Sequence, residues 1–193
     1  MTLLTGFSDP VSGAQRAFRQ ILKAMSEPGT QVELIDGPVW PFLSPAMCAA
    51  LLTLVDHDTP LYLAAPFAGE QLKENLRFHT GAPLVDRAAR AAFALLDRDF
   101  PAVLLDEFAV GSGECPHRSA TLIVDVPALT GAPPLTLRGP GIESRRQTAA
   151  ALSPAVRDYL CRRPVSFPLG LDFIFTCGRQ LLAIPRTTHV EVD

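Results

Sequence analysis

Two short segments place an arginine beside hydroxyl side chains, a combination that suits the binding of a phosphate or phosphonate group. Arg118 precedes Ser119 and Thr121, and Arg186 precedes Thr187. The planar guanidinium can donate two hydrogen bonds to one oxyanion, and neighbouring hydroxyls can donate more. The alternative is structural, with each arginine paired to an aspartate while the hydroxyls cap turns. For either segment alone, the residues favour this structural interpretation.

A third segment, His79-Thr80-Gly81, places an imidazole and a hydroxyl where a helix is predicted to end. The helix dipole at that end favours the protonated ring. No catalytic residue is assigned. The candidate anion-binding residues are therefore His79, Arg118, Ser119, Thr121, Arg186 and Thr187.

Two further patterns predict neither a nucleotide loop nor a metal site. Gly139–Ser144 holds two of the three glycines of a dinucleotide-binding loop, but Pro140 lacks an amide donor. A tight turn after a strand is the better interpretation. Cys115 with His117, and the run Asp56-His57-Asp58, are compact groups of potential ligands. Neither supplies a complete tetrahedral set, so no metal is predicted.

Hydrophobic spacing and capping residues predict the helices that must position these groups. Apolar residues recur at intervals of three and four between Ser12 and Met25, which is typical of an amphipathic helix. Ser44-Pro45 and Ser153-Pro154 each combine an N-cap with proline at the first helical position. Gly81 is a predicted C-cap. The predicted helices span about 12–25, 44–55, 70–79, 102–108 and 153–162.

Strands are predicted where β-branched and apolar residues cluster between turn residues. The run Ala120–Val126 is the clearest of them. The run Arg90–Asp97 fits a helix or a strand, and a buried strand is preferred because a chain break follows it. Cys177-Gly178-Arg179 separates two apolar runs and predicts a hairpin. The predicted strands span about 30–36, 60–65, 90–97, 120–126, 135–137, 171–176 and 180–184.

The order of these elements predicts an α/β fold with a mixed β-sheet flanked by helices. Helices and strands alternate early, and the chain is expected to close on an antiparallel pair. The length of 193 residues, without repeats or a linker, predicts a single domain over residues 1–193.

Composition and charge exclude several classes of function. With 17 basic and 20 acidic residues, the net charge of −3 argues against general nucleic-acid binding. No apolar run is long enough to span a bilayer, and the first residues lack the features of a signal peptide. The four cysteines form no CxxC pair, and Cys48 and Cys177 are expected to be buried as small apolar side chains. We therefore expect a soluble cytoplasmic protein.

Seven short segments, in order along nearly the whole chain, resemble the PhnH family, a subunit of the bacterial carbon–phosphorus lyase system. Each segment is individually weak, but their order is specific. They are Phe18-Arg19 through Ala24–Thr30, Leu54–Pro60, His79–Gly81, Pro116–Thr121, Leu137–Ile142, Phe167–Asp172 and Leu182–Thr188.

The resemblance implies a fold similar to the large domain of pyridoxal-phosphate-dependent transferases, without the lysine that holds their cofactor. The sequence agrees with that loss, because its only lysines, Lys23 and Lys73, lie in predicted helices. A lysine that forms a Schiff base needs a desolvated or cation-lined pocket. No cofactor is therefore expected.

The resemblance also implies partners and a function. It implies that the chain forms a homodimer, which joins PhnG, PhnI and PhnJ in a complex and acts with PhnL. This set converts ATP and an alkylphosphonate into ribose 1-alkylphosphonate 5-triphosphate and adenine during organophosphonate catabolism. The chain is thus expected to be an accessory, non-catalytic subunit of this synthase. A small proportion of charged residues, 19%, also favours self-association, because it leaves apolar surface to cover.

Two alternatives remain open at this point. The first is a small homodimeric enzyme or ligand receptor with its own anion site around Arg118, His79 and Arg186. The second is a homodimeric protein that acts outside any complex.

Overall fold

The computed structural model of the chain describes residues 3–192 and contains helices of two kinds. The three short 3-10 helices are η1 (Ala65–Phe67), η2 (Ala88–Arg90) and η3 (Pro116–Arg118). The α-helices are α1 (Pro10–Ser26), α2 (Pro45–Leu54), α3 (Glu70–Thr80), α4 (Leu104–Glu107) and α5 (Pro154–Arg162).

The strands form two sheets. The large sheet has the order β1-β9-β8-β5-β4-β2-β3, in which β9 runs antiparallel to both neighbours and the strands from β8 to β3 are parallel. The small antiparallel sheet has the order β10-β6-β7. The strands are β1 (Val32–Glu33), β2 (Leu61–Leu63), β3 (Leu84–Val85), β4 (Phe93–Leu96), β5 (Thr121–Asp125), β6 (Leu135–Arg138), β7 (Arg146–Thr148), β8 (Asp172–Cys177), β9 (Gln180–Ile184) and β10 (His189–Val192).

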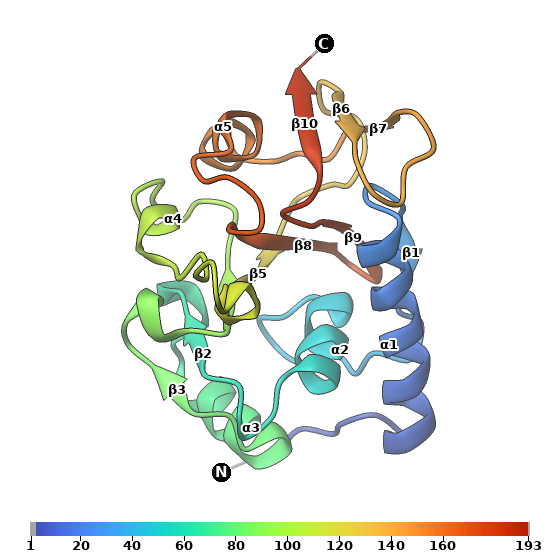
Figure 1. Ribbon diagram of the computed structural model, residues 1–193. Helices are drawn as coiled ribbons and strands as arrows, with labels where there is room; N and C mark the ends of the chain where they lie inside the picture. The colour runs from blue at the N-terminus through green and yellow to red at the C-terminus, as the bar shows by residue number, and fades with distance from the viewer. Residues whose placement is uncertain (1–2, 193) are drawn as a thin grey trace.

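The core lies around β5, β8 and the short helix α2. Side chains 46–51 of α2 are all buried, which fits a helix that is apolar on every side and enclosed by other elements. It packs against β5, β8 and α1. Figure 1 shows α1 beside α2, with the small sheet and α5 at one end of the molecule and α3 at the other. The predicted mixed sheet flanked by helices is therefore confirmed.

The capping signals in the sequence mark real helix ends. The hydroxyls of Ser44 and Ser153 each accept a hydrogen bond from a backbone N–H in the first turn, at 3.4 Å. Gly81 adopts the left-handed conformation at the end of α3, with φ 70°. Helix α1 begins two residues earlier than predicted, because Asp9 caps it and Pro10 occupies the first helical position. The ambiguous run before Asp97 is a strand, β4.

The sequence analysis missed three strands. The expectation that the chain closes on the antiparallel β8–β9 pair is also wrong. Strands β3, β7 and β10 have two to four residues each, too short for an alternating pattern to show. Strand β10 follows the hairpin and pairs with β6 to complete the small sheet. Strand β1 is also shorter than expected, at two residues. Cys48 is buried as predicted, whereas Cys177 is only partly buried.

The Gly139-Pro140-Gly141 segment is a tight turn after β6, as its sequence predicts. Gly141 has φ 79°, and a Cβ atom built there would lie 1.8 Å from the Ser26 carbonyl oxygen. Only glycine allows the turn to approach the end of α1 this closely. The turn therefore joins the small sheet to α1.

Candidate functional site

Both arginine–hydroxyl segments lie at one edge of the large sheet. Strand β5 begins at Thr121, in register with Asp172 at the start of the parallel strand β8. Arg118 and Ser119 immediately precede β5, and Arg186 follows the end of β9, which runs in the opposite direction. The fold therefore brings these loops, and Thr187 with them, to the edge where the parallel strands begin.

The Arg186 side chain makes three internal hydrogen bonds at this edge. Its Nε and Nη2 atoms donate to the two carboxylate oxygens of Asp172 at 3.2 and 2.5 Å, and Nη1 donates to the Pro116 carbonyl oxygen at 2.7 Å. The Arg186 backbone N–H also donates to Asp172 at 2.8 Å. The two side chains are only 17% and 10% exposed. This pair ties the loop before β5 to β8 and to the segment after β9.

Arg163, which the sequence analysis did not single out, lies beside the Arg186–Asp172 pair. We refer to these three residues as the arginine cluster. Arg163 ends α5 in the left-handed conformation, with φ 46°. Its Nη2 donates to the Arg186 carbonyl oxygen at 3.0 Å, and Nη1 lies against the His189 ring. Arg163, Arg186 and Thr188 line a small cleft of about 30 Å³, which has room for one or two water molecules.

Two hydroxyls beside this cluster are buried without a hydrogen-bond partner among the described residues. They are Oγ of Ser119 and Oγ1 of Thr188, in residues that are 7% and 4% exposed. Burying a polar group unpaired is costly, so such groups usually meet water or a ligand. Tyr159 lines the same cleft, and burial raises the pKa of its hydroxyl to about 12. The Tyr159 hydroxyl is therefore neutral at physiological pH.

His79 does not join the arginines. Its Nε2 lies 2.8 Å from the Leu4 carbonyl oxygen, and its ring lies 5.2 Å from that of Trp40. Trp40 in turn donates to the Thr5 carbonyl oxygen at 2.9 Å. Within residues 3–192, these contacts place His79 against the N-terminal segment. It holds that segment to α3 and lies apart from the cluster around Arg186.

The cluster lies at the edge opposite to the one that usually binds ligands. In open α/β sheets, ligands bind outside the carboxyl ends of the parallel strands. That edge of β5 carries Asp125, which the sequence analysis overlooked although it ends the clearest predicted strand. Burial raises the pKa of Asp125, while hydrogen bonds with Ser44 and Thr176 oppose the shift. The Thr176 hydroxyl donates to Asp125 at 3.2 Å.

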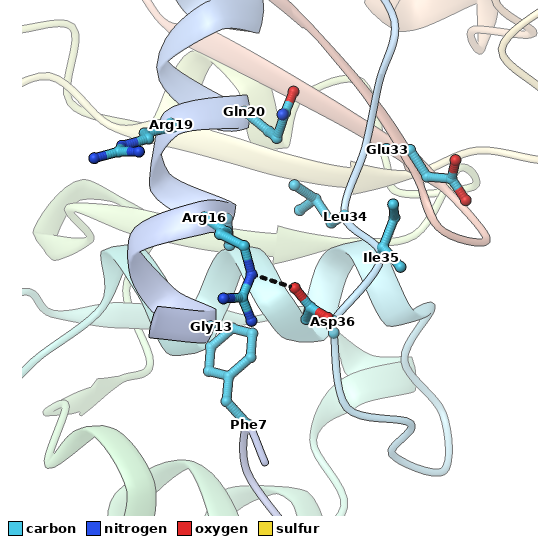
Figure 2. A pocket seen from close by; sticks show the side chains of 11 residues that line it. Phe7, Gly13, Arg16, Arg19, Gln20, Glu33, Leu34, Ile35 and Asp36 are labelled. Atoms are coloured by element: carbon cyan, nitrogen blue, oxygen red, sulfur yellow. Dashed lines mark hydrogen bonds and ion pairs between the residues drawn. The ribbon is translucent and has the colours of Figure 1, made fainter. Parts of the chain in front are cut away.

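A surface groove of about 250 Å³ lies between α1 and the segment after β1. Figure 2 shows Arg16 reaching across its end to Asp36, with Nε and Oδ2 at 2.7 Å, while Arg19 points away. Sequence reasoning missed this groove because its two walls are distant in the chain. Within the described residues, no group of three or more His, Cys, Asp or Glu side chains is placed to hold a metal ion. No helix among them is long and apolar enough to cross a membrane.

Comparison with known proteins agrees with the family resemblance. A family model described as bacterial phosphonate metabolism protein (PhnH) matches residues 5–191. The chain is 37% identical, over 96% of its length and 94% of the relative's, to the alpha-D-ribose 1-methylphosphonate 5-triphosphate synthase subunit PhnH of Rhizobium meliloti (strain 1021). It is 31% identical, over 92% of its length and 86% of the relative's, to HtxG of Stutzerimonas stutzeri, which is named as a C-P lyase subunit protein.

Proposed function

Because the chain belongs to the PhnH family of bacterial phosphonate metabolism proteins, we propose that it is a subunit of the synthase that makes ribose 1-alkylphosphonate 5-triphosphate. The observation that carries this proposal is the 37% identity to a named subunit of that synthase over 96% of this chain. The reaction joins an alkylphosphonate to the ribose of ATP and releases adenine. The second relative, named as a C-P lyase subunit protein, supports the same phosphonate-degrading role.

In this proposal the chain is an accessory subunit that catalyses no step itself. Arg186 is engaged with Asp172 and Pro116, and His79 with the N-terminal segment, which supports a structural use of both groups. The partners that the resemblance implies are PhnG, PhnI, PhnJ and PhnL, together with a second copy of this chain. Their common location would be the cytoplasm.

The same proposal includes a fold like that of the pyridoxal-phosphate-dependent transferases, without their cofactor. Lys73 is paired with Glu70 at 2.8 Å on α3, and Lys23 is exposed on α1. We therefore expect no internal aldimine. After incubation with pyridoxal phosphate and removal of the excess, the visible absorbance of an aldimine that Lys23→Ala or Lys73→Ala abolishes would contradict this expectation.

A deletion strain tests the main proposal. A host lacking its own PhnH-type gene, but holding the other subunits, should regain growth on methylphosphonate as sole phosphorus source when this chain is expressed. The tagged chain should also co-purify with the other subunits from those cells. Growth on inorganic phosphate is the control. Failure of both rescue and co-purification, with the chain folded and abundant, would contradict the proposal.

A second candidate function, binding of an oxyanion at the edge where β5 begins, is supported by the two unpartnered hydroxyls of Ser119 and Thr188. Arg118, next to Ser119 in the chain, is exposed, and its guanidinium forms no hydrogen bond or ion pair with another described residue. Calorimetric titration with inorganic phosphate and with methylphosphonate tests this site. Arg118→Gln should abolish the heat of binding, whereas Arg87→Gln, at an exposed arginine elsewhere, should not. Absence of heat with the wild-type chain would refute the site.

A further inference from the structure

Helix α1 carries bulky apolar side chains on its outer side, whereas three of the four buried residues on its inner side are small. Gly13, Ala17 and Ala24 are buried, together with Ile21, and allow α1 to pack closely on α2, β1 and β9. Phe18 and Leu22 remain 48% and 54% exposed. A surface helix with one apolar partner normally turns its large apolar residues inward. Their outward placement indicates a second packing partner.

The exposed large apolar residues of α1 lie along one side of the helix, and we define them as the apolar stripe: Val11, Phe18 and Leu22. The spacings of seven and four residues place all three on the same side of the helix. Val11 is 81% exposed, and about half of Phe18 and of Leu22 is exposed as well. Grouped apolar exposure of this kind marks interaction surfaces more often than scattered single residues do.

A row of positive charge runs beside this stripe. Arg19 and Lys23 are one turn apart and directly follow Phe18 and Leu22 in the sequence, and α1 contains no acidic residue. Within residues 3–192, neither cation forms an ion pair, whereas Arg16 is paired with Asp36. Arg19 also lines the groove, and Figure 2 shows its side chain directed away from that pair. The chain as a whole has a net charge of −3, so this face differs in sign from the rest.

From these observations, and resting on the proposed function, we infer that the outer side of α1 is the docking surface for another subunit of the synthase. The occupant has an apolar ridge that covers Phe18 and Leu22, flanked by carboxylates that meet Arg19 and Lys23. Burial of the apolar stripe supplies affinity, and the complementary charges fix the register and speed association. A face along a helix of 17 residues, about 25 Å long, is a substantial part of an interface of ordinary size.

The test is the affinity of purified chain variants for the complex of the remaining subunits. Phe18→Gln/Leu22→Gln should weaken binding about tenfold or more, because it removes central apolar contacts. Arg19→Glu/Lys23→Glu should slow association about tenfold at low salt, and the difference from wild type should shrink as salt rises. All four positions are exposed or partly exposed, so circular dichroism and thermal midpoint should stay at wild-type values.

Matched controls lie on other surfaces. Val103→Gln/Phe167→Gln changes two exposed apolar residues, and Arg87→Glu/Arg90→Glu changes two exposed cations. Both should bind like wild type. If wild type binds and both α1 variants bind equally well, the docking surface is refuted while the proposed function stands. If Phe18→Gln/Leu22→Gln only converts a dimer to a monomer, the occupant is a second copy and the inference is wrong. If wild type itself does not bind, the proposed function fails.

Discussion

Arg186 illustrates how a single residue can match a ligand-binding pattern and yet be used inside the fold. Its guanidinium and backbone N–H together make four contacts with Asp172 and Pro116, across three segments that are distant in sequence. Asp172 begins β8, so the pair fixes the start of that strand. Of the two candidate arginines at this edge, Arg118 is the one whose guanidinium forms no hydrogen bond or ion pair with another described residue.

We predict that Arg186→Met destabilises the protein by about 3 kcal/mol or more, because it leaves the Asp172 carboxylate buried without its partner. Arg118→Met, at an exposed position, should change the free energy of unfolding by no more than about 0.5 kcal/mol. Urea denaturation followed by circular dichroism measures both. Equal stability of the two variants would contradict this account of Arg186.

Growth of cells that carry Arg186→Met on methylphosphonate distinguishes a structural role of Arg186 from a functional one. If growth on methylphosphonate survives Arg186→Met once expression is restored, Arg186 is structural. If stability barely changes but growth or assembly fails, Arg186 serves a ligand or a partner instead.

The raised pKa of Asp125 leads us to predict a specific pH dependence of the free energy of unfolding. Burial raises its pKa above the ordinary 3.8, so the folded chain retains a proton that the unfolded chain has lost. Stability therefore falls as pH rises from 3.8 through the raised pKa. Asp125→Asn removes this loss, and its stability relative to wild type should increase with pH over that window.

Asp9 provides a control of opposite sign for this measurement. A hydrogen bond with Ser12 lowers the pKa of Asp9, so its carboxylate stabilises the fold above pH 3.8 and loses that effect as pH falls. Asp9→Asn should therefore be less stable than wild type above pH 3.8, with the difference vanishing in acid. Urea titrations at a series of pH values compare the variants. Parallel pH profiles for Asp125→Asn and wild type would refute the assignment.

At the scale of elements, the junction between α1 and the small sheet connects the two parts of the fold. Arg146 on β7 donates to the carbonyl oxygens of Glu27 and Pro28 at 2.9 and 3.0 Å, and to the Thr30 hydroxyl at 2.6 Å. These carbonyls follow the end of α1, where a cation is electrostatically favoured. Gly141 supplies the second contact, against Ser26. The junction therefore depends on the Arg146 guanidinium and on the absence of a side chain at Gly141.

Substitution of two glycines tests this junction. Gly141→Ala should cost about 3 kcal/mol or more, since the new methyl group would collide with the Ser26 carbonyl oxygen and force the elements apart. Gly131→Ala is the matched control, because Gly131 also has positive φ, 85°, but open space around it. It should lose only about 1–2 kcal/mol for the left-handed conformation. Similar losses in thermal or urea unfolding would contradict the proposed contact.

At the scale of the whole molecule, several large apolar side chains are exposed on surfaces other than α1. Ile35, Val39 and Phe42, in the segment between β1 and α2, are examples. Trp40 and Leu43 of that segment are buried in the core, whereas the side chains of Ile35, Val39 and Phe42 are exposed. Apolar exposure on more than one surface supports a chain that associates with other chains.

We predict that the isolated chain is a homodimer. Light scattering at micromolar concentration should give a mass of roughly twice 20.8 kDa, because association covers apolar surface that a monomer would expose. The Phe18→Gln/Leu22→Gln variant should remain dimeric, since the apolar stripe of α1 is assigned to another subunit. A mass near 20.8 kDa for the wild-type chain would show that it is a monomer.

The sequence by itself determined the local structure, where a residue type acts on its immediate neighbours. Ser44 and Ser153 mark helix starts, and Gly81 marks a helix end, because caps depend on contacts within three or four residues. The strongest strand, β5, is visible for a similar reason, since β-branched residues favour extended backbone. The ordered motifs also identified the family, which the similarity over residues 5–191 confirms.

Only the tertiary structure decided which distant residues meet. From the sequence, Arg186 could bind an anion or pair with Asp172. The register of β8 with β9 brings Asp172 within hydrogen-bonding distance of Arg186. The sequence analysis grouped His79 with the arginines, whereas the fold places His79 against Leu4. Strands β7 and β10 are too short to show a pattern and exist because β6 supplies their partners. Pairings of this kind depend on chain geometry over tens of residues, which local spacing does not encode.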